Sequence, residues 1–447
     1  MSLITERARS HNDSQPQKKP PLRVAFFWLG AFYFIYCARP EDWVKALGYA
    51  PMAKITAIMA LFGLFFSMGK TPRRLSDLPR EAVYLLIMIA LLFVSALFSP
   101  IWRGGAFFNT LNFSKMYVAW VLTFLLITTH ERLRRIISIQ ALAVAAVSAI
   151  AIVKGHSVPR LNGVIGGVYS NPNDLAFAIV LNFPFCLAFF VRTKQLFRRM
   201  LWGGGMLMMG AALVLTASRA GFIDFLISGT VCLWHFGIKG RRLYLIVSTV
   251  FIGTLLLLLA GGRLKERFYG LAGSTDTEVE DVANGSYEER RELMVKSLEG
   301  IAHYPILGMG MNNFMVYSGH WKEVHAVYLQ IAVEGGIPVL ILFLLFLKRG
   351  FANLNELRRM RHLDVDTKLF VGALHSSLIG FVVGACFAPE AYQYFTYFAI
   401  CYTSVLFAIV KEREKTEPAS GVWRVQNALS AEPTVSGNVY AREHFHG

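Results

Sequence analysis

Three arginines and one histidine have the types and positions that could do chemistry. Arg219 lies between two apolar runs, Arg290 and Arg291 are neighbours in a polar stretch, and His325 begins the next apolar run. A guanidinium is a permanently charged, planar set of donors that suits phosphate oxygens. A histidine titrates near neutral pH and can act as a general base. The set predicts an anion-binding site suited to phosphate oxygens, with a general base beside it.

Each of these residues also has a structural explanation. Arg219 could lie at a membrane interface with its aliphatic stem in apolar surroundings. Arg290 and Arg291 could be solvated charges beside neighbouring glutamates. An isolated histidine is usually structural or interfacial. His325 is favoured as a base only because the topology argued below places it on the same face as the arginines.

Apolar runs make up most of the chain, which has 447 residues and is 55% hydrophobic. A helix of about 20 apolar residues crosses the hydrocarbon core of a bilayer. The sequence therefore predicts an all-α, polytopic membrane protein with about twelve transmembrane helices. The predicted spans are 24–37, 52–68, 82–98, 113–129, 136–153, 174–191, 201–217, 222–238, 243–261, 324–347, 369–388 and 391–410. The first follows a polar start without a small-residue cleavage site, so we expect it to be retained.

The net charge of +16 indicates topology and not nucleic-acid binding. Five connections (69–81, 129–135, 192–200, 238–242 and 348–366) together carry 19 Lys and Arg, whereas the five alternate ones (38–51, 99–112, 154–173, 218–221 and 389–390) carry 6. Basic loops stay in the cytoplasm. We therefore expect both termini to be cytoplasmic and the long polar loop 262–323, with the site, to lie on the outer side of the membrane.

The expected organisation is one membrane domain, residues 24–410, between two disordered cytoplasmic tails, 1–23 and 411–447. The tails are polar and lack apolar periodicity. The loop 262–323 holds 7 Lys and Arg against 10 Asp and Glu. No internal repeat of the kind common in secondary transporters is apparent.

The polar loop contains signals for a helix. Ser286 and Glu289 fit a capping box, which predicts a helix over 287–303 that ends before Pro305. Leu293, Met294, Ser297, Leu298 and Ile301 would then share one face. Arg290 and Arg291 would fall in the first turn, where cations oppose the helix dipole. The acidic stretch 270–285 is expected to be a mobile flap.

Polar residues near the outer ends of other spans could line a groove for donor or acceptor. They are Asn171 and Asn173, which are also candidate helix caps, together with Ser218 and Tyr328. Glu334 is expected to be buried and not to serve as a second catalytic acid. The five cysteines are scattered, so buried free thiols are expected. Motifs for nucleotides, bound metals or serine nucleophiles are missing, and we expect no cofactor and no metal.

Together these residues resemble the bacterial O-antigen ligase and the O-antigen and exopolysaccharide polymerase family of membrane glycosyltransferases. The resemblance covers about 162–347. It depends on the order of four elements: NPNDLA (171–176), SRAG (218–221), an arginine-bearing helix leading into HYPILGMGMNNF (303–314), and HxxYLQxxxEGG (325–336). Met294, Ala326 and Val339 depart from residues frequent in the family.

The resemblance implies transfer of a glycan from undecaprenyl diphosphate to an acceptor on the periplasmic side. It implies that Arg219 and Arg290 (or Arg291) hold the diphosphate while His325 activates the acceptor hydroxyl. Direct displacement would invert the anomeric centre without a metal. The implied partners are the lipid-linked glycan donor, an acceptor that is a glycan, lipid A–core (in lipopolysaccharide assembly) or a protein hydroxyl, the bilayer, and other polysaccharide assembly proteins.

Two other classes stay open. A transporter or flippase of lipid-linked glycans would have a similar number of helices, but it should carry paired polar groups in mid-membrane. Asp224 and Glu334 are among the few such candidates here. A non-catalytic assembly scaffold could carry the same loop, yet it would not need arginines and a histidine on one face.

Overall fold

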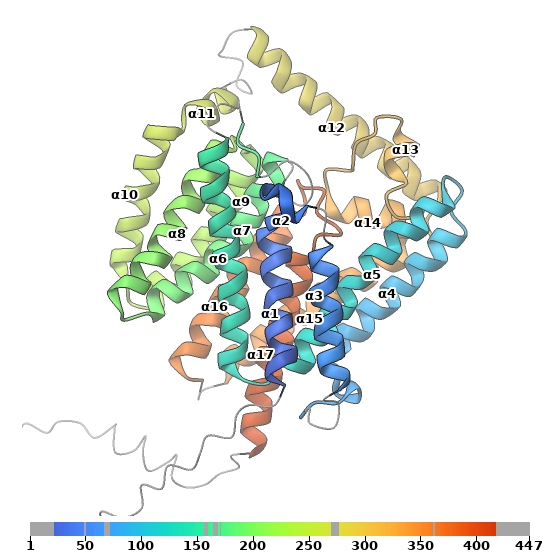
Figure 1. Cartoon of the computed structure of the whole chain (residues 1–447). Coiled ribbons are helices and arrows are strands. Elements are labelled where there is room, and N and C mark those ends of the chain that lie inside the picture. Colours follow the sequence, from blue (N-terminus) through green and yellow to red (C-terminus); the bar gives the residue numbers. More distant parts are fainter. Residues whose placement is uncertain are drawn as a thin grey trace, which may run out of the picture. The chain divides into compact units, whose positions relative to one another are not determined.

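The computed structural model describes residues 22–48, 51–66, 72–155, 160–163, 169, 171–269, 277–360 and 363–416, and the regular secondary structure of these residues is entirely helical. The chain divides into two compact units, residues 1–407 and 408–447. The helices are drawn in Figure 1. They are α1 (Arg23–Ala38), α2 (Pro40–Trp43), α3 (Met52–Phe65), α4 (Arg80–Leu97), α5 (Arg103–Leu126), α6 (His130–Lys154), α7 (Pro172–Arg192), α8 (Leu196–Leu215), α9 (Arg219–Cys232), η5 (Leu233–Ile238), α10 (Leu243–Ala260), α11 (Gly262–Tyr269), α12 (Thr277–His303), α13 (Phe314–Ser318), α14 (Val327–Gly335), α15 (Ile337–Arg359), α16 (Val365–Gly384) and α17 (Tyr394–Thr416).

Seven helices of the described part are long and apolar enough to cross a membrane. They are α4, α6, α7, α9 with η5, α15, α16 and α17, and α1, α3 and α10 are shorter apolar helices. The chain is thus a multi-pass membrane protein. The count of twelve spans and the outward position of the 262–323 loop stay predictions.

The predicted span 324–347 is wrong as a single helix. Residues 322–326 are irregular, α14 begins at Val327, and Gly336 separates it from α15. Gly336 has φ +83°, and a Cβ there would lie 2.2 Å from the carbonyl oxygen of Ile306. An L-residue would meet both backbone strain and a clash. The chain therefore breaks where the sequence reads as one apolar run.

The start of the predicted loop helix is also wrong. α12 begins at Thr277, so Ser286 lies inside the helix and not at its N-cap. Arg290 and Arg291 accordingly lie in the middle of α12, and the dipole argument for them fails. Residues 277–285 of the expected flap are helical, while 270–276 lie outside the described residues. The predicted end, just before Pro305, is confirmed.

A short stretch after α12 fits against the break between α14 and α15. The backbone N–H groups of Met309 and Gly310 donate to the carbonyls of Val333 and Glu334, at 3.0 and 2.9 Å. Gly308 has φ +66°, and a Cβ on it would lie 2.5 Å from the Glu334 carbonyl. This approach of two backbones explains the glycines of Gly-Met-Gly, which the sequence presented only as a helix terminator.

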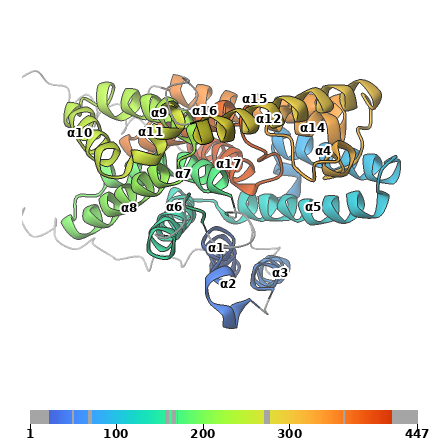
Figure 2. The same ribbon diagram turned by 90° about the horizontal axis from the view of Figure 1, so that it is seen from above.

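A small apolar core joins these pieces to one another. Its buried members are Leu293 of α12, Met309, Phe314 of α13, Val324 and Val333 of α14. Seen from above, α12 runs over α14 (Figure 2), and the two helices pack against each other. The core therefore fixes α12 above the membrane helices and determines where its side chains point.

The membrane helices also bury polar side chains in pairs. The amide of Gln140 donates to Asn182 at 2.8 Å and accepts from the hydroxyl of Tyr402 at 2.7 Å, and the hydroxyls of Tyr33 and Thr123 are 2.9 Å apart. These bonds join α6, α7 and α17, and α1 to α5. Partnered polar groups of this kind connect membrane helices.

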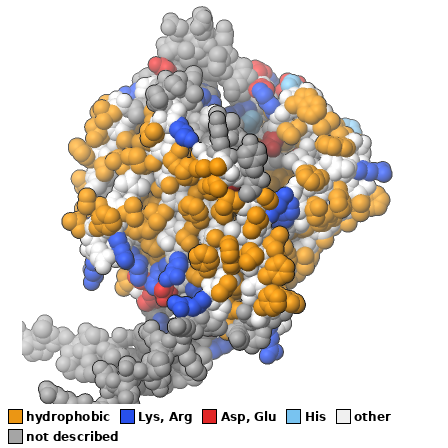
Figure 3. Space-filling model, in the orientation of Figure 1, with side chains coloured by type: hydrophobic (Ala, Val, Ile, Leu, Met, Phe, Trp, Pro, Cys, Tyr) orange, Lys and Arg blue, Asp and Glu red, His pale blue; other side chains and the backbone are white. Residues whose placement is uncertain are grey.

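The surface has an apolar band and a basic end. Hydrophobic side chains cover the middle of the face in Figure 3, and Lys and Arg gather toward its lower edge. Four of the free cysteines are buried as expected, whereas Cys386 is exposed. The charge distribution agrees with a membrane orientation in which the basic end is cytoplasmic, which stays a prediction.

Candidate functional site

Arg219 is the first residue of α9, and the local sequence builds that helix start. The Ser218 hydroxyl caps the helix by accepting from the Gly221 N–H at 3.1 Å. A Cβ on Gly221 would lie 2.5 Å from the Cβ of Ala176, so the glycine lets α9 pack closely against α7. Ala217 supports the turn with φ +49°. The free N–H groups of a helix start favour an anion, and Arg219 adds a full charge there.

Arg290 and Arg291 differ sharply in environment. Arg290 is three and seven residues from Leu293 and Ser297, which are buried, so it shares the packed face of α12 and is itself half-buried. Burial lowers the pKa of Arg290, and Glu289 opposes this effect. Arg291 is exposed and pairs loosely with Glu288 at 3.9 Å. Tertiary packing therefore distinguishes two arginines that the sequence could not.

The predicted apolar face of α12 is only half correct. Leu293 and Ser297 are buried, together with Gly300, whereas the side chains of Met294 and Leu298 are 47% and 52% exposed. The buried face of α12 is thus narrower than predicted. Arg290 lies on this narrow face and is therefore only half-buried.

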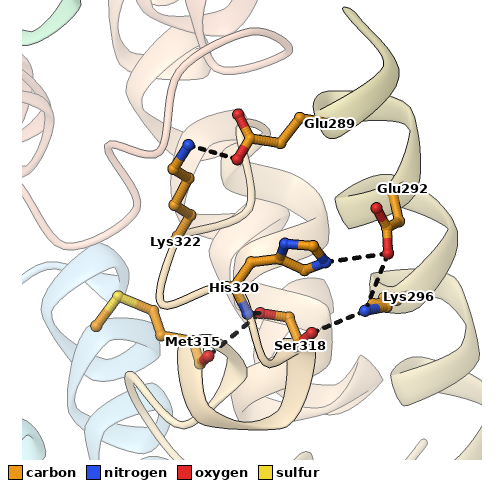
Figure 4. Close-up of polar contacts among 7 residues, drawn as sticks. All are labelled: Glu289, Glu292, Lys296, Met315, Ser318, His320 and Lys322. Atoms are coloured by element: carbon orange, nitrogen blue, oxygen red, sulfur yellow. Dashed lines mark hydrogen bonds and ion pairs between the residues drawn. The ribbon is translucent and has the colours of Figure 1, made fainter. Parts of the chain in front are cut away.

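Polar contacts fasten the segment before His325 to α12 (Figure 4). Lys322 pairs with Glu289, and His320 bonds to Glu292 at 3.0 Å. Lys296 reaches both Glu292, at 3.1 Å, and the carbonyl of Ser318, at 2.8 Å. Arg291 lines an open hollow on the same surface with Glu288, Glu292 and His320. These contacts fix the position of α12 relative to residues 318–322, which come just before His325.

His325 lies just before α14 and is held by its neighbours. Two residues on, the Val327 N–H donates to the Ala385 carbonyl at the end of α16, at 2.8 Å. Burial lowers the pKa of His325 from 6.5 to about 4, and the charges of Arg290 and Lys322 add to this while Glu289 opposes it. Its Nδ1 is buried and has no hydrogen-bond partner among the described residues. The ring is therefore neutral at physiological pH and has one unused nitrogen.

The three predicted residues Arg219, Arg290 and His325 come together. Arg290 is close enough to repel the charge of Arg219 and that of protonated His325. They come from the start of α9, the middle of α12 and the segment before α14. Arg290 is thus within electrostatic reach of both Arg219 and His325, and like charges held together favour an anion between them.

The four groove candidates have mainly structural contacts. Asn171 caps α7 by accepting from the Asn173 N–H at 3.0 Å, and the Tyr328 hydroxyl donates to the Val382 carbonyl on α16 at 3.0 Å. Asn173 accepts from the Ser218 hydroxyl at 2.8 Å and from Arg160 at 3.3 Å. Asn173 and Ser218 therefore tie the start of α7 to the start of α9, beside Arg219.

Several carboxylates near the site were missed by the sequence reasoning. Burial, followed by the charge of Asp174, raises the pKa of Glu323 to about 7. Glu390 is buried, bonds to Asp174, and also lies near Glu323, so its pKa is raised well above the ordinary value. These residues are far apart in sequence. The only available signal was that Glu323 lies two positions before His325.

Two further carboxylates, Glu334 and Asp224, lie in the interior of the protein. Glu334 is 1% exposed, as expected for a buried residue, and Asp224 is buried in α9. Within the described ranges, no group of three or more His, Cys, Asp and Glu is placed to hold a metal ion. The site is therefore built from two arginines, a histidine and nearby carboxyl groups.

A fold of packed apolar helices defines a class, that of polytopic membrane proteins. Residues 204–344 match the family model described as O-antigen ligase. The match includes α9, α12, the Gly-Met-Gly stretch and α14, so this part of the chain is similar to O-antigen ligases. No curated protein matches it significantly.

Proposed function

We propose that the protein is an inverting, metal-independent glycosyltransferase that moves a glycan from undecaprenyl diphosphate to an acceptor hydroxyl at the periplasmic face of the inner membrane. The observation that carries the proposal is the convergence of Arg219, Arg290 and His325 from three distant parts of the chain. The family match supports glycan transfer in general.

The two arginines act on the leaving group. A sugar diphosphate leaves as an anion, and preorganised guanidinium groups stabilise the charge that develops on it. Arg219 contributes from the start of a helix, where the backbone N–H groups favour the same charge. Arg290 contributes from α12, whose position is fixed by its apolar core and by its contacts with residues 318–322.

His325 acts on the acceptor. Its neutral ring can take the proton of the attacking hydroxyl, which then attacks the anomeric carbon as the diphosphate departs. A pKa of about 4 describes a weak base. A bound diphosphate would offset the field of Arg290, and the pKa of His325 would then rise toward its ordinary value. Donor binding would thus prepare the base.

Glu323 is a second candidate for the base. Its pKa of about 7 is closer to physiological pH than that of His325, and general bases work best when the two match. It lies two residues before His325 and interacts with Asp174 and Glu390. We keep His325 as the base because it adjoins Arg290, and we assign Glu323 to the acceptor side.

The first test is transfer by purified protein. With an undecaprenyl-diphosphate-linked glycan and lipid A–core, a second lipid-linked glycan or a protein as acceptor, the wild type should form product with one of them. His325→Ala should lower the rate by about 10²- to 10⁴-fold, the usual contribution of a general base. Expression and the melting temperature should hardly change, because His325 lies outside the helices.

The matched control for this test is His303→Ala. His303 is exposed at the end of α12, and its ring bonds to the carbonyl of Glu299 in the same helix at 2.8 Å, so its loss should leave transfer within a few-fold of wild type. Transfer by His325→Ala within a few-fold of wild type would remove it as the base. Failure of all three acceptors with wild-type protein would favour the transport or scaffold alternatives.

A further inference from the structure

Two lysines lie on the outward-facing apolar surfaces of α3 and α5, away from the arginine site. Lys54 is exposed on α3, on the same face as Ile58, Leu61 and Phe65, which follow at helical spacing and are 49%, 40% and 66% exposed. α3 and α5 pack against each other, and both lie apart from α9 in Figures 1 and 2.

Lys115 has the same setting on α5. It is exposed between Leu111 and Val118, which are also exposed and lie one turn away on either side. Lys115 lies near the start of the predicted span 113–129, and Lys54 is the third residue of α3. Both ammonium groups are therefore expected at the level of the lipid headgroups, where lysine side chains reach polar surroundings.

The two ammonium groups face each other without a counter-charge. Lys54 is close enough to repel the charge of Lys115. Lys115 donates to the Asn112 side chain at 2.5 Å, and neither lysine has an ion pair within the described ranges. Near α3 and α5, blue side chains interrupt the orange surface in Figure 3. Like charges held close together at a membrane surface favour an anion between them.

We propose that Lys54 and Lys115 bind the headgroup phosphate of an anionic phospholipid, with Asn112 as a neighbouring polar contact. A phosphate between two ammonium groups removes their repulsion. The exposed apolar residues below Lys54 and beside Lys115 give the acyl chains a surface along both helices. The site belongs to the outward face of α3 and α5, and is separate from the diphosphate site formed by α9 and α12.

The experiment measures lipid binding to the purified full chain in detergent by native mass spectrometry. Phosphatidylglycerol and phosphatidylcholine are titrated against wild type and Lys54→Gln/Lys115→Gln. Wild type should prefer phosphatidylglycerol, and the double variant should lose about tenfold in affinity for it with no change for phosphatidylcholine. Melting temperatures without added lipid check folding.

Lys348→Gln/Lys368→Gln is the control, because it removes two exposed lysine charges from α15 and α16. An equal loss in this control, or no preference for phosphatidylglycerol in wild type, overturns the proposal. A pair that takes undecaprenyl diphosphate in preference to phosphatidylglycerol overturns the phospholipid assignment. Binding is read without glycan transfer, so the result is independent of the proposed function.

Discussion

Two regions of the molecule hold buried polar groups, and they treat them in opposite ways. Among the membrane helices, Gln140, Asn182 and Tyr402 satisfy one another in a short chain of hydrogen bonds. At the site, His325 has a buried nitrogen without a partner, and Glu390 has a buried carboxylate oxygen without one, as far as the chain is described. Both regions are polar, but only in the Gln140 network do the buried side chains supply one another's hydrogen-bond partners.

The difference separates a structural role from a ligand-binding one. Unpartnered buried polar groups cost free energy, and a bound substrate would supply the partner that His325 lacks. The carboxylate oxygens of Asp224 also lack a partner in the described part of the chain, so the difference holds between the Gln140 network and the His325 site. The site also brings like charges together, since Arg219 and Arg290 repel each other. The side chains of the Gln140 network are uncharged, so no like charges repel each other within it. Changes in the two regions should therefore have different consequences.

After the loss of His325, the largest effect on transfer is expected at the arginines. Lysine keeps the charge but loses the forked contact with phosphate oxygens. Arg219→Lys and Arg290→Lys should each slow transfer by about 10- to 150-fold, the equivalent of one charge-assisted hydrogen bond of roughly 1.5–3 kcal/mol. Alanine should be worse in each case, and the melting temperature should hardly change.

Arg291→Lys is the internal control for the diphosphate clamp, by which we mean the binding of the diphosphate by Arg219 and Arg290. Arg291 is exposed and pairs loosely with Glu288, so transfer should stay close to wild type. If Arg291 were the sensitive residue, the placement of α12 would be wrong while a clamp survived. Normal transfer by all three lysine variants would refute the clamp.

A change in the interior network should affect stability instead. Gln140→Leu leaves the polar atoms of Asn182 and Tyr402 without that partner, which should cost about 1–2 kcal/mol. The melting temperature in detergent should fall, while transfer per folded molecule stays within a few-fold of wild type. A variant of normal stability that loses transfer would contradict the division between the two regions.

The smallest effect expected is a shift in pH dependence. Protonation removes a base, so activity should fall as the pH drops through the pKa of His325. That pKa is about 4 without donor and should be higher with donor bound, so the acid limb of kcat should lie at higher pH than that of kcat/KM.

Glu323→Gln distinguishes the two candidate bases. Glu323 titrates at about 7, so if it were the base, the variant would lose both transfer and a limb near that pH. If His325 is the base, the acid limb should persist and transfer should fall only a few-fold. Asp42→Asn, which alters a carboxylate paired with Arg39, serves as the control substitution.

The sequence by itself determined the helical membrane class, the end of α12 before Pro305 and the burial of Glu334. It also carried the resemblance to O-antigen ligases, which the family match over residues 204–344 supports. These follow from local signals: apolar runs of membrane length, a proline that cannot continue a helix, and motifs read in order. The same signals misplaced the start of α12, because a plausible capping box at Ser286 lies inside a longer helix. They also missed the break at Gly336, whose cause is the distant carbonyl of Ile306.

Only the tertiary structure decided which groups meet. It distinguished Arg290 from Arg291, because one of them shares a helix face with the buried Leu293 and Ser297. It lowered the pKa of His325 through burial and the nearby Arg290, and it brought Glu323 close to Asp174 and Glu390. The physical reason is that burial and charge act through space, whereas a sequence orders residues only along the chain.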